Sequence, residues 1–251
     1  MMHTMYVEKD SPLHSLDPRV KVISTALLTI IVILTTHPVF SPLMFLTIAL
    51  GLRILGGIKV GYQLRVLKPL LPLFLLTFAI WPFIIDPWKR GVLVGIGYTF
   101  RLASMALLAL GLLMTTTQKD LILGLVKLGL PYELGLATTM ALRYIPTLYA
   151  LTQNIMDAQK SRGLELEKGK FLERMRKMAA IVIPLIALTI KTAHELSIAM
   201  ESRGFGASKK RTFLRDIKMQ RNDYLALSLV TILAIIYLYL HLSLGLGSFS
   251  P

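Results

Sequence analysis

The stretch Gly91–Thr117, GVLVGIGYTFRLASMALLALGLLMTTT, carries a single charged residue in 27 positions. A membrane-spanning helix needs about 20 mostly apolar residues, so this stretch predicts one span. Tyr224–Leu244 meets the same requirement, and Leu67–Ile85 does so with three prolines that predict kinks. Val20–Thr36 and Val39–Leu55 are 17 residues each and are separated only by a His-Pro turn, which favours a hairpin of two short spans. The sequence therefore predicts an all-α, polytopic membrane protein with about five transmembrane helices.

The composition of the 251-residue chain agrees with a membrane location. Hydrophobic residues make up 54% of the chain and charged residues only 17%, whereas a soluble domain has about 25% charged residues. This balance excludes an ordinary soluble enzyme. The chain has no cysteine, which excludes a disulfide framework, a thiolate metal site and a cysteine nucleophile.

The positive charges predict the orientation of the spans. The chain has 28 Lys and Arg residues and a formal net charge of +14. Of these residues, 25 fall in segments 1–21, 53–68 and 118–223, which lie on one side of the predicted spans. Because cytoplasmic loops carry the excess of Lys and Arg, we expect a cell-membrane protein with a cytoplasmic N-terminus. Topology and contact with lipid headgroups explain the excess, and no nucleic-acid partner is expected.

Two features bear on the number and function of the spans. Arg101 is the one charge inside an apolar run, and intramembrane charges are candidates for function. If the span instead starts near Tyr98, Arg101 lies among the outer headgroups. The apolar stretch Ala179–Ile190 has only 12 residues, so we expect it to lie on the membrane surface or on a partner rather than to form a sixth span.

The segment 118–223 is a 106-residue insert between two spans, which predicts a cytoplasmic helical coupling domain rather than a simple connection. A short amphipathic helix near residues 121–130 precedes two helices at about 131–161 and 170–202. Each of the two has about 30 residues and a length of about 45 Å. Their internal prolines, Pro146 and Pro184, predict kinks. The predicted domains are 1–117 with four spans, 118–223 with the coupling helices, and 224–251 with the last span.

The two long helices end in the same pattern, Ala-x-x-Ser-Arg-Gly followed by an apolar residue, at positions 41 residues apart. A cation in the last turn and a glycine after it favour helix capping, which alone explains one copy. Capping requires neither the alanine nor the serine. Two copies therefore suggest two equivalent partner surfaces, each receiving one helix end through the fork of an arginine. The residues predicted to make these contacts are Ala158, Ser161, Arg162, Gly163, Ala199, Ser202, Arg203 and Gly204.

Four segments of the chain resemble the transmembrane T component of energy-coupling factor (ECF) transporters, the EcfT/CbiQ family. They are Leu13–Lys21 (LHSLDPRVK), Ala141–Pro146 (ALRYIP), Ser161–Gly163 (SRG) and Glu201–Gly206 (ESRGFG). The motif of the family is Ala-Arg-Gly, and both copies in this chain have serine in the first place. That departure is small in volume and keeps the arginine and the glycine.

The resemblance implies a role and a set of partners. In the family, the motif-bearing helices dock into two ATP-binding-cassette (ABC) ATPase subunits and hold a substrate-binding S component. Arg162 and Arg203 would then lie in the two ATPase grooves. ATP and Mg would be bound by the partner ATPases, with no cofactor and no catalysis on this chain. The implied function is to transmit ATP-driven motion for the uptake of a vitamin or of a transition metal such as cobalt.

The sequence contains neither a nucleotide-binding motif nor a metal-binding motif. The nearest approach to a phosphate loop, Gly163 to Lys170, has the wrong spacing and has Phe171 where a hydroxyl is needed. The histidines have no metal-ligand spacing, so no metal site is expected. The alternative is a self-contained channel or secondary transporter, which predicts polar residues along the spans or two repeated halves with paired helix breaks. A membrane anchor that recruits a cytoplasmic protein without transport is a third hypothesis.

Overall fold

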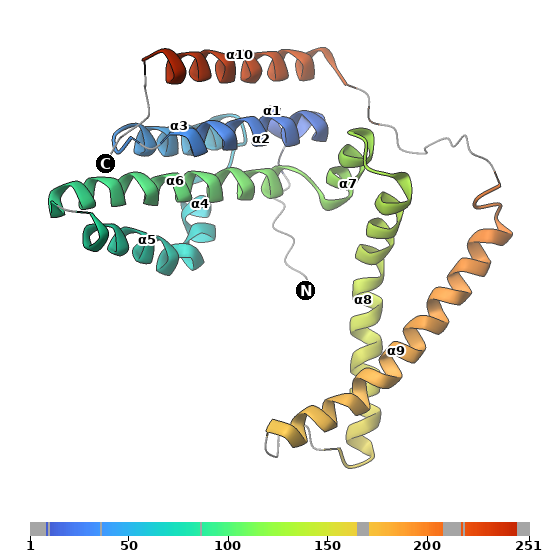
Figure 1. Ribbon diagram of the computed structural model, residues 1–251. Helices are drawn as coiled ribbons and strands as arrows, with labels where there is room; N and C mark the ends of the chain where they lie inside the picture. Colours follow the sequence, from blue (N-terminus) through green and yellow to red (C-terminus); the bar gives the residue numbers. More distant parts are fainter. Residues whose placement is uncertain are drawn as a thin grey trace. The chain divides into compact units, whose positions relative to one another are not determined.

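The computed structural model describes residues 9, 11–35, 37–85, 87–164, 171–207, 217 and 219–244, and all their regular structure is helical (Figure 1). The predicted all-α fold is confirmed. The helices form two compact units, of which unit 1 contains α1–α7 and α10 and unit 2 contains α8 and α9. The elements are α1 (Pro12–Ser15), α2 (Pro18–Leu34), α3 (Phe40–Ile54), α4 (Val60–Leu67), the 3-10 turn η1 (Lys68–Leu70), α5 (Leu71–Ile84), α6 (Trp88–Thr115), α7 (Gln118–Lys127), α8 (Tyr132–Ser161), α9 (Phe171–Ser202) and α10 (Arg221–Leu244).

Helix α6 is the centre of unit 1 and packs against α2, α3, α4 and α5. Its glycines allow these neighbours to come close. A Cβ atom added at Gly91 would lie 2.7 Å from the Cα atom of Pro82 in α5, and one at Gly95 would lie 3.0 Å from an α5 carbonyl oxygen. A Cβ atom at Gly111 would lie 2.9 Å from a methyl group of Leu52 in α3. Small residues at such spacing are typical of helix pairs inside membranes.

Four stretches of the described helices are long and apolar enough to cross a membrane: Val60–Ile84, Trp88–Thr115, Met175–Ser202 and Arg221–His241. The first, second and fourth correspond to predicted spans. The other two predicted spans form α2, with 17 residues, and α3, a shorter apolar helix of 15 residues. The helix lengths therefore fit a multi-pass membrane protein.

Two of the three prolines predicted to kink the third span lie near its start. Pro69 lies in η1, which separates α4 from α5, and Pro72 lies in the first turn of α5. A proline is tolerated in a first turn because its missing N–H has no helical partner there. Pro82 lies inside α5, close to the Gly91 contact with α6.

The predicted hairpin of two short spans corresponds to α2 and α3, which follow each other in the chain and line one hollow together. Helix α2 packs mainly against α6, α7 and α10, and α3 packs mainly against α6. The contact of Gly111 with Leu52 brings α3 close to α6. At the other end of α2, the hydroxyl groups of Thr35 and of Tyr237 in α10 share a hydrogen bond.

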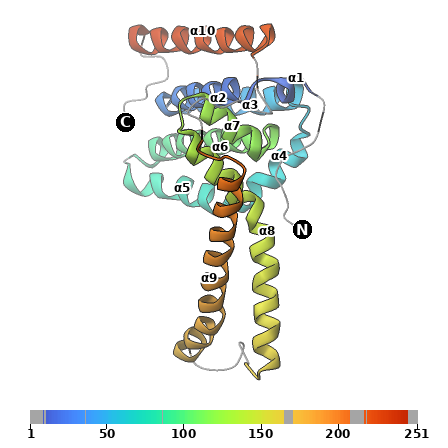
Figure 2. The same ribbon diagram turned by 90° about the vertical axis from the view of Figure 1, so that its right-hand side faces the viewer.

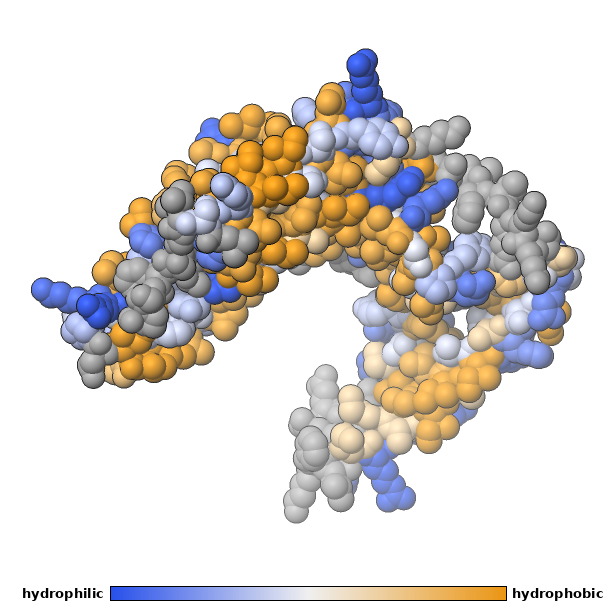
Figure 3. Space-filling view, turned by 45° about the horizontal axis from the view of Figure 1, so that its top comes forward, coloured by the Kyte–Doolittle hydropathy of each residue, from blue (hydrophilic) through white to orange (hydrophobic). Residues whose placement is uncertain are grey.

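The outer surface of unit 1 is hydrophobic. Figure 3 shows hydrophobic side chains over much of its visible face. An apolar patch of this extent on a soluble protein marks an interface, and on spanning helices it is the surface that lipid covers. In α10 the outward-facing apolar side chains are Leu225, Leu229, Ile232, Leu233, Ile235, Ile236 and Leu238, each at least 44% exposed.

Unit 2 consists of α8 and α9, which pack against each other and cross (Figures 1 and 2). Both helices continue through their internal prolines, Pro146 in α8 and Pro184 in α9. The predicted kinks at these prolines stay predictions.

The helix α9 corrects one expectation. Its candidate span, Met175–Ser202, has 28 residues and extends well beyond the apolar stretch Ala179–Ile190. The prediction that this region is too short to cross a membrane is therefore wrong on length and apolar content. The division into units follows contacts and not membrane boundaries, so the predicted domains 1–117, 118–223 and 224–251 stay predictions.

Candidate functional site

The first copy of the repeated pattern closes α8 with a complete Schellman cap. The N–H of Gly163 donates to the carbonyl oxygen of Lys160 at 2.9 Å, and the N–H of Leu164 donates to that of Gln159 at 3.0 Å. Gly163 has a φ of 86°, the left-handed conformation that this cap needs and that glycine adopts without strain. Arg162 is the cap residue, and its N–H donates to the carbonyl oxygen of Gln159 at 3.1 Å.

The second copy closes α9 with the same hydrogen bonds. The N–H of Gly204 donates to the carbonyl oxygen of Glu201 at 2.9 Å, and the N–H of Phe205 donates to that of Met200 at 3.0 Å. Gly204 has a φ of 80°, and the N–H of Arg203 donates to Met200 at 3.1 Å. The capping role predicted for both glycines is confirmed. The two backbones present an arginine at the same point of the same turn.

The residues of both copies are exposed. A Cβ atom at Gly163 or Gly204 would meet no atom within 4 Å, so the surroundings of both turns are open. The guanidinium groups of Arg162 and Arg203 form no ion pair with the part of the chain that the structure describes. Both arginines are therefore available to a partner. The exposed residues of the two copies are Ala158, Ser161, Arg162, Gly163, Ala199, Ser202, Arg203 and Gly204.

The serines contribute to the helix ends through their own backbone. The Ser161 hydroxyl donates to the carbonyl oxygen of Asp157 at 3.0 Å, and the Ser202 hydroxyl donates to that of Ala199 at 3.0 Å. The Ala199 carbonyl lies in the last turn of α9, where carbonyl groups lack helical partners, and the Asp157 carbonyl lies just before the last turn of α8. Serine therefore keeps the alanine-like small volume and adds a local hydrogen bond.

The two copies lie at opposite ends of unit 2. In Figures 1 and 2, α9 starts beside the C-terminal end of α8 and runs back past it, so that their C-terminal ends point apart. The 32 residues of α9 correspond to a length of about 48 Å. A single small surface cannot receive both arginines at that separation. The structure therefore brings together the residues within each copy and keeps the two copies apart.

The surface of unit 2 between the two copies is largely uncovered and apolar. In the described residues of α8 and α9, only Gly135, Ile155 and Ile181 are buried. Exposed apolar side chains on a helix pair of this kind need a lipid or protein cover. On α9 they are Met175, Met178, Val182, Ile183, Ile186, Leu188, Ile190 and Ile198, each at least 40% exposed.

Two hollows in unit 1 are apolar. A hollow of about 680 Å³ is lined by α3, α4, α5 and α6, and its two charged residues, Arg65 and Lys68, follow each other closely on α4 and η1. A second hollow of about 260 Å³ has Lys21 as its only charged lining residue. Ion and solute pathways through membranes are lined with polar groups, so these hollows do not favour the channel hypothesis. In the described residues no three His, Asp or Glu side chains are placed to hold a metal ion.

Arg101, which the sequence leaves open, lies midway along α6. Its guanidinium carbon lies 5.6 Å from the ring centroid of Tyr98, and Tyr98 stacks on Trp81 at 4.3 Å. Tyr and Trp are enriched at membrane interfaces, so this trio fits an arginine among headgroups. The helix itself begins ten residues before Tyr98, at Trp88. The role of Arg101 stays a prediction.

The chain is similar to known proteins over nearly its whole length. Residues 9–213 match the family of cobalt transport proteins named CbiQ. The energy-coupling factor transporter transmembrane protein EcfT of Acidaminococcus fermentans is 33% identical, over 92% of this chain and 94% of that protein. The protein of the same name from Lactococcus lactis subsp. cremoris is 30% identical over 94% and 96%, and that from Bacillus subtilis is 31% identical over 92% and 95%.

Proposed function

The chain belongs to the CbiQ/EcfT family of ECF transporter transmembrane components, and from that membership we propose that it couples two ABC ATPase subunits to a substrate-binding S component. The observation that supports this proposal most directly is the pair of identical caps with exposed arginines at opposite ends of unit 2. Two separated and equivalent contacts fit two equivalent partners. Arg162 enters the groove of one ATPase, and Arg203 enters that of the other.

The helix pair transmits the motion of the ATPases. Closure of the two ATPases on ATP brings their grooves together, and hydrolysis lets them separate. Because α8 and α9 cross, a displacement of their far ends changes the angle between them. The exposed apolar side chains of α9 hold the S component, which reorients and releases a vitamin or a transition-metal ion. ATP and Mg are bound and used by the partner subunits, and this chain performs no catalysis.

The proposed orientation places the N-terminus and unit 2 in the cytoplasm. Because the chain has no cysteine, single cysteines report their side of the membrane without background. We expect a cysteine in place of Lys89 to react with an impermeant thiol reagent added outside the cell, and a cysteine in place of Lys160 to react only after the membrane is opened. The reverse pattern would overturn the orientation.

Co-purification tests the proposed function against its alternatives. The chain carrying an affinity tag is isolated from the membranes of its own organism, and the proteins that accompany it are identified. The proposal predicts ABC ATPase subunits together with a small hydrophobic membrane protein. Isolation of the chain alone, as a stable homo-oligomer, would instead favour the self-contained transporter, and recovery of a soluble partner without ATPases would favour the membrane anchor.

A further inference from the structure

Two segments of unit 1 connect the chain to unit 2. Helix α7 leads to α8, and the chain returns from α9 at Ile217, just before α10. Both segments are fastened to the same five residues at the start of α2, Asp17–Lys21.

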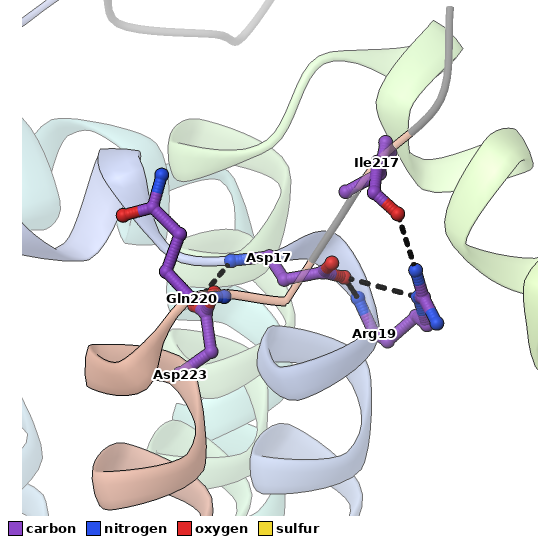
Figure 4. Close-up of polar contacts among 5 residues, drawn as sticks. All are labelled: Asp17, Arg19, Ile217, Gln220 and Asp223. Carbon is purple, nitrogen blue, oxygen red and sulfur yellow. Dashed lines mark hydrogen bonds and ion pairs between the residues drawn. The ribbon is translucent and has the colours of Figure 1, made fainter.

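The returning segment is held by two charged side chains (Figure 4). Arg19 donates from Nη2 to the carbonyl oxygen of Ile217 at 2.7 Å. The carboxylate of Asp223, in the first turn of α10, accepts from the backbone N–H of Asp17 at 2.8 Å and from that of Gln220 at 2.7 Å. Asp223 therefore caps α10 and ties it to the start of α2 with one buried side chain, only 3% exposed.

Lys21 holds the end of α6, from which the chain continues into α7. Its Nζ atom donates to the carbonyl oxygen of Thr115, the last residue of α6, at 2.9 Å, and to that of His14 at 3.0 Å. Lys21 is only 7% exposed, and the negative charges of Asp120, Asp223 and Asp17 favour its charged form.

Helix α7 itself lies on the start of α2. Its first turn is capped by Thr117, whose hydroxyl oxygen accepts from the N–H of Asp120 at 3.2 Å. One turn further on, a Cβ atom added at Gly124 would lie 3.0 Å from the Cβ atom of Pro18. The glycine thus permits a backbone contact between α7 and α2, next to the Lys21 hydrogen bonds.

Helix capping explains only part of this cluster. The side chain of Asp17 caps α2 by accepting from the N–H of Arg19 at 2.9 Å. Capping of α2 requires neither Lys21 nor the contact with Asp223, which lies 206 positions away in the sequence. Burial of three charged side chains is costly unless their partners are fixed, so such a cluster specifies one arrangement of the segments that meet there.

We propose that Asp17–Lys21, together with Asp223, is a fixed joint that delivers the motion of unit 2 to the membrane helices. Both connections to unit 2 lead to this joint, so a displacement that arrives at the joint reaches α2, α6 and α10 together. Arg19, Lys21 and Asp223 are positioning residues, because they act through the helices that they join. The proposal rests on the proposed function.

A disulfide across the joint tests whether it stays closed. Replacing Pro18 and Gly124 with cysteine places two Cβ atoms 3.0 Å apart, and a shift of about half an ångström brings them into the Cβ–Cβ range of a disulfide. No other cysteine is present to compete. In the assembled complex in proteoliposomes, we expect ATP-driven uptake to be the same with the disulfide formed and with it reduced. Loss of uptake on oxidation, restored by reduction, would overturn the proposal, since the joint would then have to open.

Replacing Lys21 with methionine, K21M, tests whether the joint is needed. We expect uptake to fall about tenfold or more while both ATPases still co-purify, because the loss of one buried charge leaves its partners unpaired in unit 1. K89M, at an exposed lysine in the first turn of α6, is the matched control and should transport normally. Normal uptake by K21M, or loss of the ATPases from it, would contradict the joint.

The combination of the two changes separates transmission from folding. In K21M with the cysteine pair, formation of the disulfide should restore uptake, since a covalent bond between α7 and the start of α2 takes the place of the lost Lys21 bonds to the end of α6. If K21M does not accumulate in the membrane, the proposal is tested by the disulfide between positions 18 and 124 in the chain that keeps Lys21.

Amide hydrogen exchange in the purified chain alone keeps this proposal distinct from the proposed function. Asp223→Asn should speed exchange of the Asp17 and Gln220 amides about tenfold or more. Slow exchange at both amides in this variant would refute the joint even if the chain is shown to be a coupling subunit. If both amides exchange fast in the Asp223→Asn variant but the unchanged chain recruits no ATPase, the coupling function is refuted and the proposed joint is still supported.

Discussion

Replacement of Arg203 with alanine is expected to abolish ATP-driven uptake while leaving membrane insertion intact. The guanidinium is exposed and lies on a cap whose turn is closed by backbone hydrogen bonds, so its loss does not disturb α9. An arginine anchor in a partner groove contributes about 2 kcal/mol or more to binding, which corresponds to at least a thirtyfold loss of affinity. Arg162→Ala is expected to have the same effect at the other ATPase. Uptake and ATP hydrolysis are measured with the reconstituted complex.

Arg176→Ala provides the matched control for Arg203→Ala. Arg176 lies on the same helix and is exposed, but it is not part of a cap. Its replacement should leave uptake and ATPase binding unchanged. If both Arg162→Ala and Arg203→Ala transported normally, the caps would have no coupling role, and helix capping would be a sufficient explanation for the repeated pattern.

Replacement of Gly91 with alanine is expected to destabilise the membrane unit. The added Cβ atom would lie 2.7 Å from the Cα atom of Pro82 and 2.8 Å from the carbonyl oxygen of Trp81, and neither is part of a flexible side chain that can move away. Overpacking of this kind costs about 1–3 kcal/mol. For a chain of this size, we expect the melting temperature of the purified protein to fall by about 2–12 °C.

A second glycine in an apolar helix supplies the comparison. A Cβ atom at Gly51 in α3 would meet no atom within 4 Å, so Gly51→Ala gains helix propensity without a clash. Its melting temperature should equal or exceed that of the unchanged protein. Equal stability of the Gly91→Ala and Gly51→Ala variants would mean that α5 and α6 do not pack closely in the membrane.

The helix ends in unit 2 are well predicted because local signals fix them. The caps at Gly163 and Gly204 end α8 and α9 where the sequence pattern places them, and the starts of both helices differ from the prediction by one residue. The sequence also predicts the residues of each copy, since they are adjacent in the chain. That the two copies lie at opposite ends of unit 2 follows from the crossing of α8 and α9, which no local pattern encodes.

The parts that the sequence does not predict depend on contacts between distant segments. Helix α4 lies in the segment 53–68, for which the sequence predicts no helix before Leu67, and its buried Gln63 donates to the carbonyl oxygens of Ala49 and Ile58. The contact between Asp17 and Asp223 joins residues 206 positions apart. The family resemblance marks Leu13–Lys21 as characteristic, but only the fold gives its charged residues their partners.

The number of ATPase subunits held by one copy of this chain tests the central claim most directly. Native mass spectrometry of the complex, purified through a tag on this chain, gives that number. The account predicts two ABC ATPase subunits per chain, fewer than two in Arg162→Ala or Arg203→Ala, and none when both arginines are replaced. A complex with two ATPase subunits that survives the double replacement would contradict it.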